Sequence, residues 1–216
     1  MAGQRNAGEA DAAKDLRIGW PKQARGRARF ESLLAAAADL IAERGVDGAA
    51  FGAIARRTGT AQGSLYQYFA SKEALVTTLH ARQAAEFVAV AARCRDDFRA
   101  TPPPRDLSGL VDLLVPRLAA CYAAHPAYIE IRHALSRSAA IQDTEALADV
   151  HIAGLLGEML DDAGVGLTEG RRALVLEAII ELGDALLPWA GHDAARQGEA
   201  KAVILSYLRS VATHPL

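Results

Sequence analysis

The sequence is poor in the residue types that mark several protein classes. Only two cysteines occur, Cys94 and Cys121, with no CxxC pair and no metal-ligand spacing, so neither a disulfide scaffold nor a metal site is expected. Aromatic residues make up 6% of the chain, and no run of Val, Ile and Thr alternates long enough to predict a sheet. No apolar run reaches the length of a membrane span, and the N-terminus lacks the apolar segment of a secretory signal. We therefore expect a reduced, cytoplasmic protein with no membrane partner.

Alanine and leucine are abundant, within an apolar content of 51%. Both residues favour helices, so the composition predicts an all-α protein of one large or two small domains. Apolar periodicity and Gly or Pro breakers place the expected helices at about residues 28–44, 50–57, 61–69, 72–95, 106–124, 126–138, 143–163, 168–189 and 194–213.

Charge is distributed unevenly along the chain. Residues 1–80 carry 11 Lys and Arg against 8 Asp and Glu, and residues 81–216 carry 13 against 18. A basic N-terminal part joined to an acidic remainder suits a DNA-binding module fused to another domain, although domains without that function show such splits as well.

Residues 51–75, FGAIARRTGTAQGSLYQYFASKEAL, have the pattern of three short helices in series. Phe51 and Ile54 lie three positions apart on one face of the first helix. Gly59 provides the permissive backbone of a tight turn, and a second helix is expected over residues 61–69. A helix, a Gly-containing turn and a second helix form the helix-turn-helix motif, whose second helix enters the major groove of DNA.

The segment IARRTGTAQGSLYQYFASKEAL resembles the signature of TetR-family transcriptional regulators. Residues 33–45, LLAAAADLIAERG, are similar to the first helix of that family, and the resemblance extends over about residues 29–80. The matching positions are Ile54-Ala55, Gly59, Gly63, Leu65-Tyr66, Tyr68-Phe69 and Ser71-Lys72-Glu73.

The resemblance implies an N-terminal three-helix helix-turn-helix module and a larger C-terminal helical domain for ligand binding and dimerisation. We expect a disordered tail over residues 1–23, a DNA-binding domain over 24–72, and an effector-binding and dimerisation domain over 73–216. The implied function is sequence-specific regulation of transcription, more often as a repressor, by a homodimer that binds a palindromic operator and is released by a small molecule of unknown identity.

The resemblance implies no enzymatic activity, no cofactor and no metal. Two other classes remain open. One is a scaffold whose helix-turn-helix binds protein, and the other is a helical-bundle enzyme, against which the missing Glu-x-x-His motif argues.

The residues expected to contact DNA lie on the second helix and at the start of the third. The amides of Gln62 and Gln67 can pair with adenine, or they are solvated surface groups. The hydroxyls of Tyr66 and Tyr68 suit phosphate oxygens. Gly63 either weakens the helix or lets the backbone approach DNA. The full expected set is Gln62, Gly63, Ser64, Tyr66, Gln67, Tyr68 and Lys72.

Four basic residues before or within the start of the first helix have two open interpretations. They form an arm that contacts phosphates or the minor groove, or they belong to a solvated tail. They are Lys22, Arg25, Arg27 and Arg29.

Two positions depart from the family pattern. Ala49 and Ala50 stand where the family has a Ser or Thr cap, so one phosphate contact is not carried over. Ala61 stands where the family often has Ser, and Thr60 is a candidate cap one residue earlier.

The middle helices carry the candidate effector pocket, a mixture of apolar surface with a few polar groups. The alternative is that these residues are ordinary core or surface, and no metal site is expected at His133 and His151. The candidates are Cys121, Tyr122, Tyr128, Arg132, His133, His151, Leu155 and Met159.

The last two helices have apolar faces that suggest a four-helix dimer interface between two chains. Glu177, Glu181 and Asp184 lie on one face and are expected to be a solvated stripe, because no His or nucleophile is aligned with them. The interface candidates are Leu174, Ala178, Leu182, Ala185, Val203, Ile204, Tyr207, Leu208 and Val211.

Overall fold

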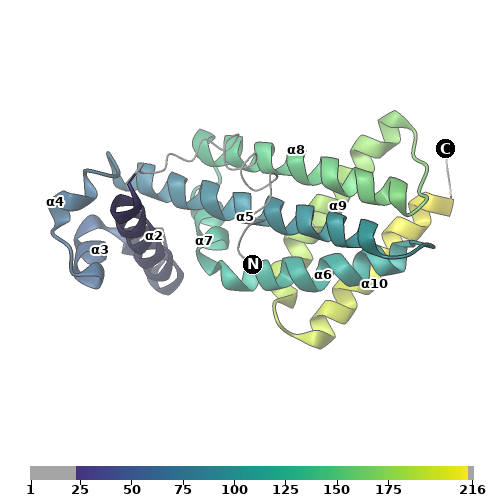
Figure 1. The fold of residues 1–216 in the computed structure, drawn as a ribbon, viewed down its shortest axis with the longest axis horizontal. Coiled ribbons are helices and arrows are strands. Elements are labelled where there is room, and N and C mark those ends of the chain that lie inside the picture. The colour runs from purple at the N-terminus through teal and green to yellow at the C-terminus, as the bar shows by residue number, and fades with distance from the viewer. Residues whose placement is uncertain (1–22, 214–216) are drawn as a thin grey trace. The chain divides into compact units, whose positions relative to one another are not determined.

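The computed structural model describes residues 23–213, and within this range the regular structure is entirely helical (Figure 1). The all-α prediction is confirmed, while the tail predicted over residues 1–23 lies, except for its last residue, outside the described residues. The elements are α2 (Ala24–Arg44), the 3-10 helix η1 (Val46–Ala49), α3 (Phe51–Thr58), α4 (Gln62–Leu65), α5 (Lys72–Ala100), α6 (Leu107–Ala124), α7 (Pro126–Ala134), α8 (Ala139–Asp162), α9 (Glu169–Ala190) and α10 (Ala194–Thr213).

The helices form two compact units. The described part of the N-terminal unit is residues 23–85 and 125–147, and that of the C-terminal unit is residues 86–124 and 148–213. Residues 125–147 therefore pack with the N-terminal helices, although the segment 86–124 of the other unit precedes them in the chain. The functional boundary expected after residue 72 stays a prediction.

The core of the N-terminal unit is built on one face of α2. Leu33, Ala37 and Ile41 recur every four residues on this face, and each is fully buried. Leu65 of α4 and Phe69 complete the core from the other side, as the sequence predicted. Burial of each large apolar side chain contributes roughly 1.5–3 kcal/mol, so this core fixes the angles between α2, α3 and α4.

The end of α3 and the start of α5 are set by the residues that the sequence predicts. Gly59 has the left-handed φ of 62°, and the following N–H of Thr60 bonds the Ala55 carbonyl at 2.9 Å, which closes the turn after α3. The Ser71 hydroxyl accepts the Ala74 N–H at 3.2 Å, so Ser71 caps α5 as predicted.

Helices α7 and α4 are shorter than predicted: α7 ends at Ala134 instead of about residue 138, and α4 is a single turn. The pattern predicts a helix over 61–69, but α4 ends at Leu65, and Tyr66–Tyr68 form a turn in which the N–H groups of Tyr68 and Phe69 both bond the Leu65 carbonyl at 2.9 Å. A helix of one turn containing Gly63 has little intrinsic stability. Packing of Leu65 and Phe69, rather than helix propensity, therefore holds this segment in place.

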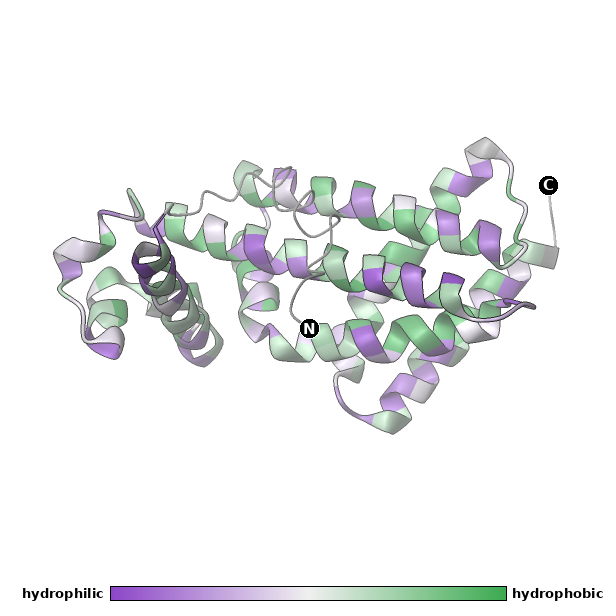
Figure 2. Cartoon of the chain, viewed as in Figure 1, coloured by the Kyte–Doolittle hydropathy of each residue, from purple (hydrophilic) through white to green (hydrophobic). Residues whose placement is uncertain are grey.

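The C-terminal unit packs α6 between α9 and α10, which also contact each other. Its helices alternate apolar and polar residues along their lengths (Figure 2). By length and composition α6 could cross a membrane, contrary to the sequence-based expectation. A core helix of a soluble protein meets the same criterion, and α6 buries seven residues, including Leu110, Leu114 and Tyr122, within the chain.

Candidate nucleic-acid interface

The α3–turn–α4 segment presents a polar face above an apolar base. Ile54 of α3 and Leu65 of α4 are fully buried, and they pack both helices onto the core of the unit. Gln62, Gly63 and Gln67 are exposed on the opposite side. The arrangement is that of a helix-turn-helix whose second helix is free to enter a groove.

The two tyrosines after α4 have different surroundings. Tyr66 is 59% exposed, and its ring packs against the edge of the Phe51 ring at a centroid distance of 4.9 Å. This contact leaves its hydroxyl in solvent, where a phosphate could accept from it. Tyr68 is half-buried, with its ring 6.2 Å from the Phe30 ring, so it contributes to packing as well.

Gln62 lies close to a basic side chain of the preceding helix. A Cβ placed on Gly52 would lie 3.5 Å from Gln62 Oε1 and 3.6 Å from Arg56 Nη1. The amide and the guanidinium therefore converge above Gly52, at the start of α3. Arg56 is exposed and supplies a positive charge beside the candidate reading helix.

Several cations of this unit are already paired with carboxylates. Lys72 Nζ lies 2.9 Å from Asp47 Oδ1, and its hydrogen bond holds the pKa of Asp47 below its usual value. Arg57 pairs with Glu43 and Arg82 with Glu31. Because Asp47 is fully exposed, the Lys72 pair contributes little to stability, and Lys72 can exchange Asp47 for a phosphate.

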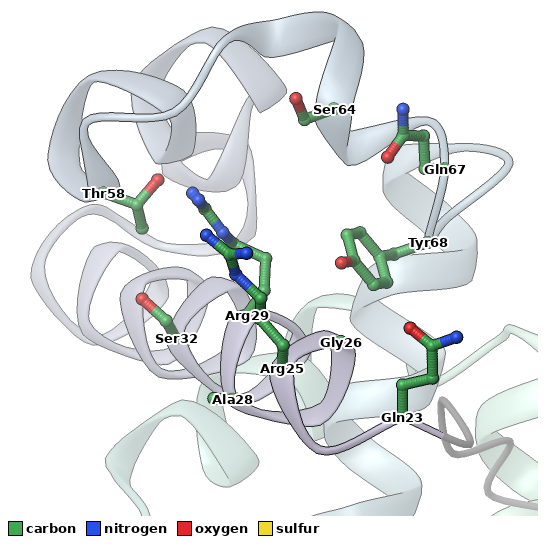
Figure 3. A pocket seen from close by; sticks show the side chains of 10 residues that line it. All are labelled: Gln23, Arg25, Gly26, Ala28, Arg29, Ser32, Thr58, Ser64, Gln67 and Tyr68. Carbon is green, nitrogen blue, oxygen red and sulfur yellow. The ribbon is translucent and has the colours of Figure 1, made fainter.

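A hollow of about 780 Å³ opens between the start of α2 and α4 (Figure 3). It contains two of the predicted arm residues, Arg25 and Arg29, which lie on the first two turns of α2 rather than in an arm; Lys22 lies outside the described residues. Thr60 does not cap α4 as expected, because the Arg29 guanidinium donates to its hydroxyl and Ala61 occupies the cap position. The hollow is lined by Gln23, Arg25, Gly26, Ala28, Arg29, Ser32, Thr58, Ser64, Gln67 and Tyr68.

Known proteins share this part of the chain. Residues 33–79 match the model of the bacterial regulatory proteins of the tetR family. A stretch of 59 residues is 44% identical to an uncharacterized HTH-type transcriptional regulator, YvdT, of Bacillus subtilis (strain 168). Residues 33–79 are therefore a tetR-family region. The stretch shared with YvdT is 27% of this chain and 29% of that relative.

Solved structures of TetR-family regulators extend the likeness of this chain beyond the N-terminal unit. A TetR-like regulator from Rhodococcus sp. RHA1 has a TM-score of 0.65 at 19% identity, over 86% of this chain and 97% of that one. PfmR from Thermus thermophilus has a TM-score of 0.59 at 18% identity, over 82% and 97%. FadR from Bacillus subtilis, solved with stearoyl-CoA, has a TM-score of 0.62 at 18% identity, over 84% and 98%. At these identities the likeness shows the fold alone.

The predicted effector residues fall in both compact units. Tyr128, Arg132 and His133 belong to the N-terminal unit, and the other five to the C-terminal unit. The structure brings Tyr128 and Arg132 together and buries Cys121, Tyr122, Tyr128 and Met159. The effector pocket as a whole stays a prediction.

A polar cluster surrounds the half-buried Glu145 in the N-terminal unit, and two of its members, His80 and Tyr128, are buried. His80, which is fully buried, places Nε2 2.5 Å from Glu145 Oε1. The Tyr128 hydroxyl donates to the same oxygen at 2.9 Å, and Arg132 Nε lies 3.1 Å from Oε2. Burial alone would raise the pKa of Glu145, but the contacts with His80, Arg132 and Tyr128 lower it below its usual value.

The sequence analysis missed His80 and Glu145. The one available signal was the position of His80 on the inner face of α5, one turn after the buried Val76. That position does not reveal that the partner of His80 is Glu145, which lies on α8 and is distant in the sequence. The His80 ring also stacks on the Tyr128 ring, at 4.7 Å and an interplanar angle of 9°.

The predicted interface residues divide between the surface and the core. Leu174, Ala185 and Val203 are exposed, and Ala178, Leu182 and Tyr207 are partly exposed. Ile204, Leu208 and Val211 are instead buried inside their own chain, because α10 turns that side toward α6 and α9. These three residues are therefore removed from the interface set.

Asp184 also differs from its expected role. The sequence places it in a solvated acidic stripe, but it is half-buried, and the Tyr122 hydroxyl donates to its Oδ1 at 2.6 Å. This bond joins α6 to α9 in the C-terminal unit. Asp184 is thus a structural acceptor.

The Cys121 thiol is expected to be unreactive in the folded protein. Burial raises its pKa to about 12, with a further contribution from the charge of Glu86, so at pH 8 roughly 1 thiol in 10⁴ is the reactive thiolate. Labelling of the Cys94→Ser variant with a disulfide reagent should be slow in buffer and fast in urea. A Ser206→Cys variant, exposed on α10, supplies the fast reference, and equally fast native labelling of Cys121 would contradict its burial.

Proposed function

We propose that this TetR-family protein is a transcriptional repressor that binds a palindromic operator as a homodimer in the cytoplasm and is released by a small molecule. The observation that carries the proposal is the exposed polar face of α4 and the following turn, with Gln62, Tyr66 and Gln67 above a fully buried Leu65. A segment that buries its apolar side and leaves amides and a phenol in solvent has the chemistry of a groove reader.

Gln62 and Gln67 are the candidates for reading bases, because their amides are exposed and can donate and accept at the same time. Tyr66 and Lys72 are candidates for phosphate contacts, which fix the register of the protein on the duplex. Gly63 is exposed and has open space where a Cβ would lie, which supports close approach of the backbone to DNA. The half-buried Ser64 and Tyr68 complete the proposed set.

Dimerisation is proposed through the exposed apolar residues of α9 and α10. Leu174 is 66% exposed, Val203 43% and Trp189 47%, and an interface with a second chain would cover such large apolar groups. Two helices from each chain would then form a four-helix bundle. The dimer places two α4 segments on successive major grooves, about 34 Å apart.

Release by an effector is proposed from the predicted pocket residues and from the likeness to FadR, which was solved with stearoyl-CoA. An effector acts by favouring a conformation in which the two α4 segments no longer match successive grooves. Its identity, the operator sequence and the regulated genes are open. Recovery of bound sequences from a random duplex pool tests the proposal, because a palindromic motif requires both DNA reading and a symmetric dimer.

The Gln67→Ala variant tests base readout. If Gln67 pairs with a base, its loss should cost about 1–3 kcal/mol on the selected operator and relax the preference at one position per half-site. Fluorescence anisotropy on the operator and on its single-base variants measures both effects.

The Gln142→Ala variant is the matched control, because Gln142 is an exposed glutamine of α8. It should bind the operator like the wild type. An equal loss of affinity by Gln67→Ala on operator and random DNA would make Gln67 a positioning contact instead.

A further inference from the structure

Arg25 and Arg29 are an unusual pair for the first two turns of a helix. They lie four residues apart on α2, both are exposed, and both line the hollow beside α4 (Figure 3). Side chains four residues apart in a helix are neighbours, so the two positive charges repel each other. The first turn of α2 contains no acidic residue, and the helix dipole disfavours cations at this end.

Several other cations of the unit have carboxylate partners, whereas Arg25 and Arg29 have none among the described residues. Arg57, Lys72 and Arg82 are each paired with a Glu or Asp. Arg29 donates instead to the neutral hydroxyl of Thr60. Mutual repulsion, the helix dipole and the lack of a carboxylate partner all make the placement of these two charges unfavourable. A bound anion would attract both guanidinium groups and would therefore offset each of these effects.

The rest of the hollow is suited to an anion. None of its ten lining residues is acidic. Ser32 of α2 and Ser64 of α4 contribute hydroxyls from two sides, whereas the Thr58 hydroxyl is engaged with the Ile54 carbonyl at 2.9 Å. Guanidinium and hydroxyl donors around one space match the oxygens of a phosphate group.

We infer that the hollow binds one phosphate of the DNA backbone, held by Arg25 and Arg29 from α2 and by Ser64 from α4. The inference rests on the proposed function and deepens it by assigning a phosphate site that α2 shares with the helix-turn-helix. DNA is the source of the phosphate because Ser64, Gln67 and Tyr68, which line the hollow, belong to the segment that reads the duplex. A phosphate held by α2 and α4 together fixes how deeply α4 enters the groove.

The test compares two double variants of equal charge on the full-length protein. The first is Arg25→Gln with Arg29→Gln. The matched control is Arg44→Gln with Arg137→Gln, which removes two exposed arginines of the same unit that do not line the hollow. Affinity for the selected operator and for a random duplex is measured by anisotropy over a range of salt concentrations, and circular dichroism confirms that each variant is folded.

Loss of one phosphate contact should reduce the slope of log K against log salt by about 0.9 for each protomer, or about 1.8 for the dimer. We expect this change, with roughly a tenfold or greater loss of affinity at about 0.1 M salt on both duplexes, for the hollow variant. The control should change the slope by less than half as much. Thr60→Val, which removes the acceptor of Arg29 but no charge, should leave the slope unchanged.

Three results would overturn the inference while leaving the proposed function standing. They are an unchanged slope in the hollow variant, an equal change in the control, and a change in Thr60→Val as large as in the hollow variant. A further measurement is calorimetric titration of the wild type with inorganic phosphate. If phosphate binds with a submillimolar dissociation constant, and this binding is lost in the hollow variant, the site would be assigned to a free anion instead of the DNA backbone. A wild-type protein that binds no duplex from the random pool would overturn the proposed function itself, and the inference with it.

Discussion

Replacing Glu145 by Ala is expected to lower the free energy of unfolding of the N-terminal unit by about 1–3 kcal/mol, the range for leaving a buried polar group without its partner. Glu145 accepts from Tyr128 and lies within ion-pair distance of His80 and Arg132. Its removal takes an acceptor from the buried Tyr128 phenol and the nearby carboxylate from the fully buried His80 imidazole. These three partners come from α5 and α7, so the loss acts on two helices at once.

The matched control is Glu130→Ala, because Glu130 is an exposed glutamate on α7, in the same unit. It removes the same side chain without touching the cluster, and its effect should stay within about 0.5 kcal/mol. Urea denaturation gives the free energies, and hydrogen exchange of the α7 peptide, Pro126–Ala134, locates the loss. Equal stability of the two variants would show that the Glu145 contacts are energetically neutral.

The same carboxylate of Glu145 predicts a pH dependence. The contacts hold the pKa of Glu145 below its usual value despite burial. Its contribution to stability is therefore present above the pKa of the unfolded chain, about 4.3, and is lost as the pH falls through the lower folded pKa. The stability difference between wild type and Glu145→Ala should be constant near neutral pH and shrink in the acid range; a difference that grows on acidification would contradict the sign.

Combining Leu174→Asp with Val203→Asp is expected to give folded monomers. Both residues are exposed in the single chain, so charge there is tolerated by the monomer but is costly inside an interface. Loss of the second DNA-binding module should lower operator affinity by about 10²–10⁴-fold, the usual gain from linking two binding modules. Sedimentation velocity and anisotropy on the same samples measure both effects.

Two comparisons decide between the interface and its alternatives. Val150→Asp is the matched control, because Val150 is 68% exposed but lies on α8; it should remain dimeric, and monomers from this variant alone would move the interface to α8. Ile204→Asp, at a buried position of α10, should unfold the C-terminal unit instead, which circular dichroism would show. A folded, dimeric Leu174→Asp/Val203→Asp protein would remove α9 and α10 from the interface.

The sequence alone determined the helices and the helix-turn-helix, because their signals are local. The left-handed Gly59, the Ser71 cap and the buried Leu65 and Phe69 all depend on residues within a few positions in the chain. Backbone sterics, capping and helical periodicity act over this range, so they can be recognised without the fold. The family match over residues 33–79 lies in the same part of the chain.

Tertiary structure alone decided which apolar face of α10 is core and which is free. Val203 and Ile204 are adjacent and similar in hydrophobicity, yet one is exposed and the other is 7% exposed, because burial depends on where α6 and α9 pack. The Glu145 cluster likewise joins residues from three helices, and the hollow is lined by both Arg25 and Ser64, which lie far apart in the chain. Burial, ion pairing and the shape of a binding site are set by neighbours distant in sequence, and no local pattern encodes them.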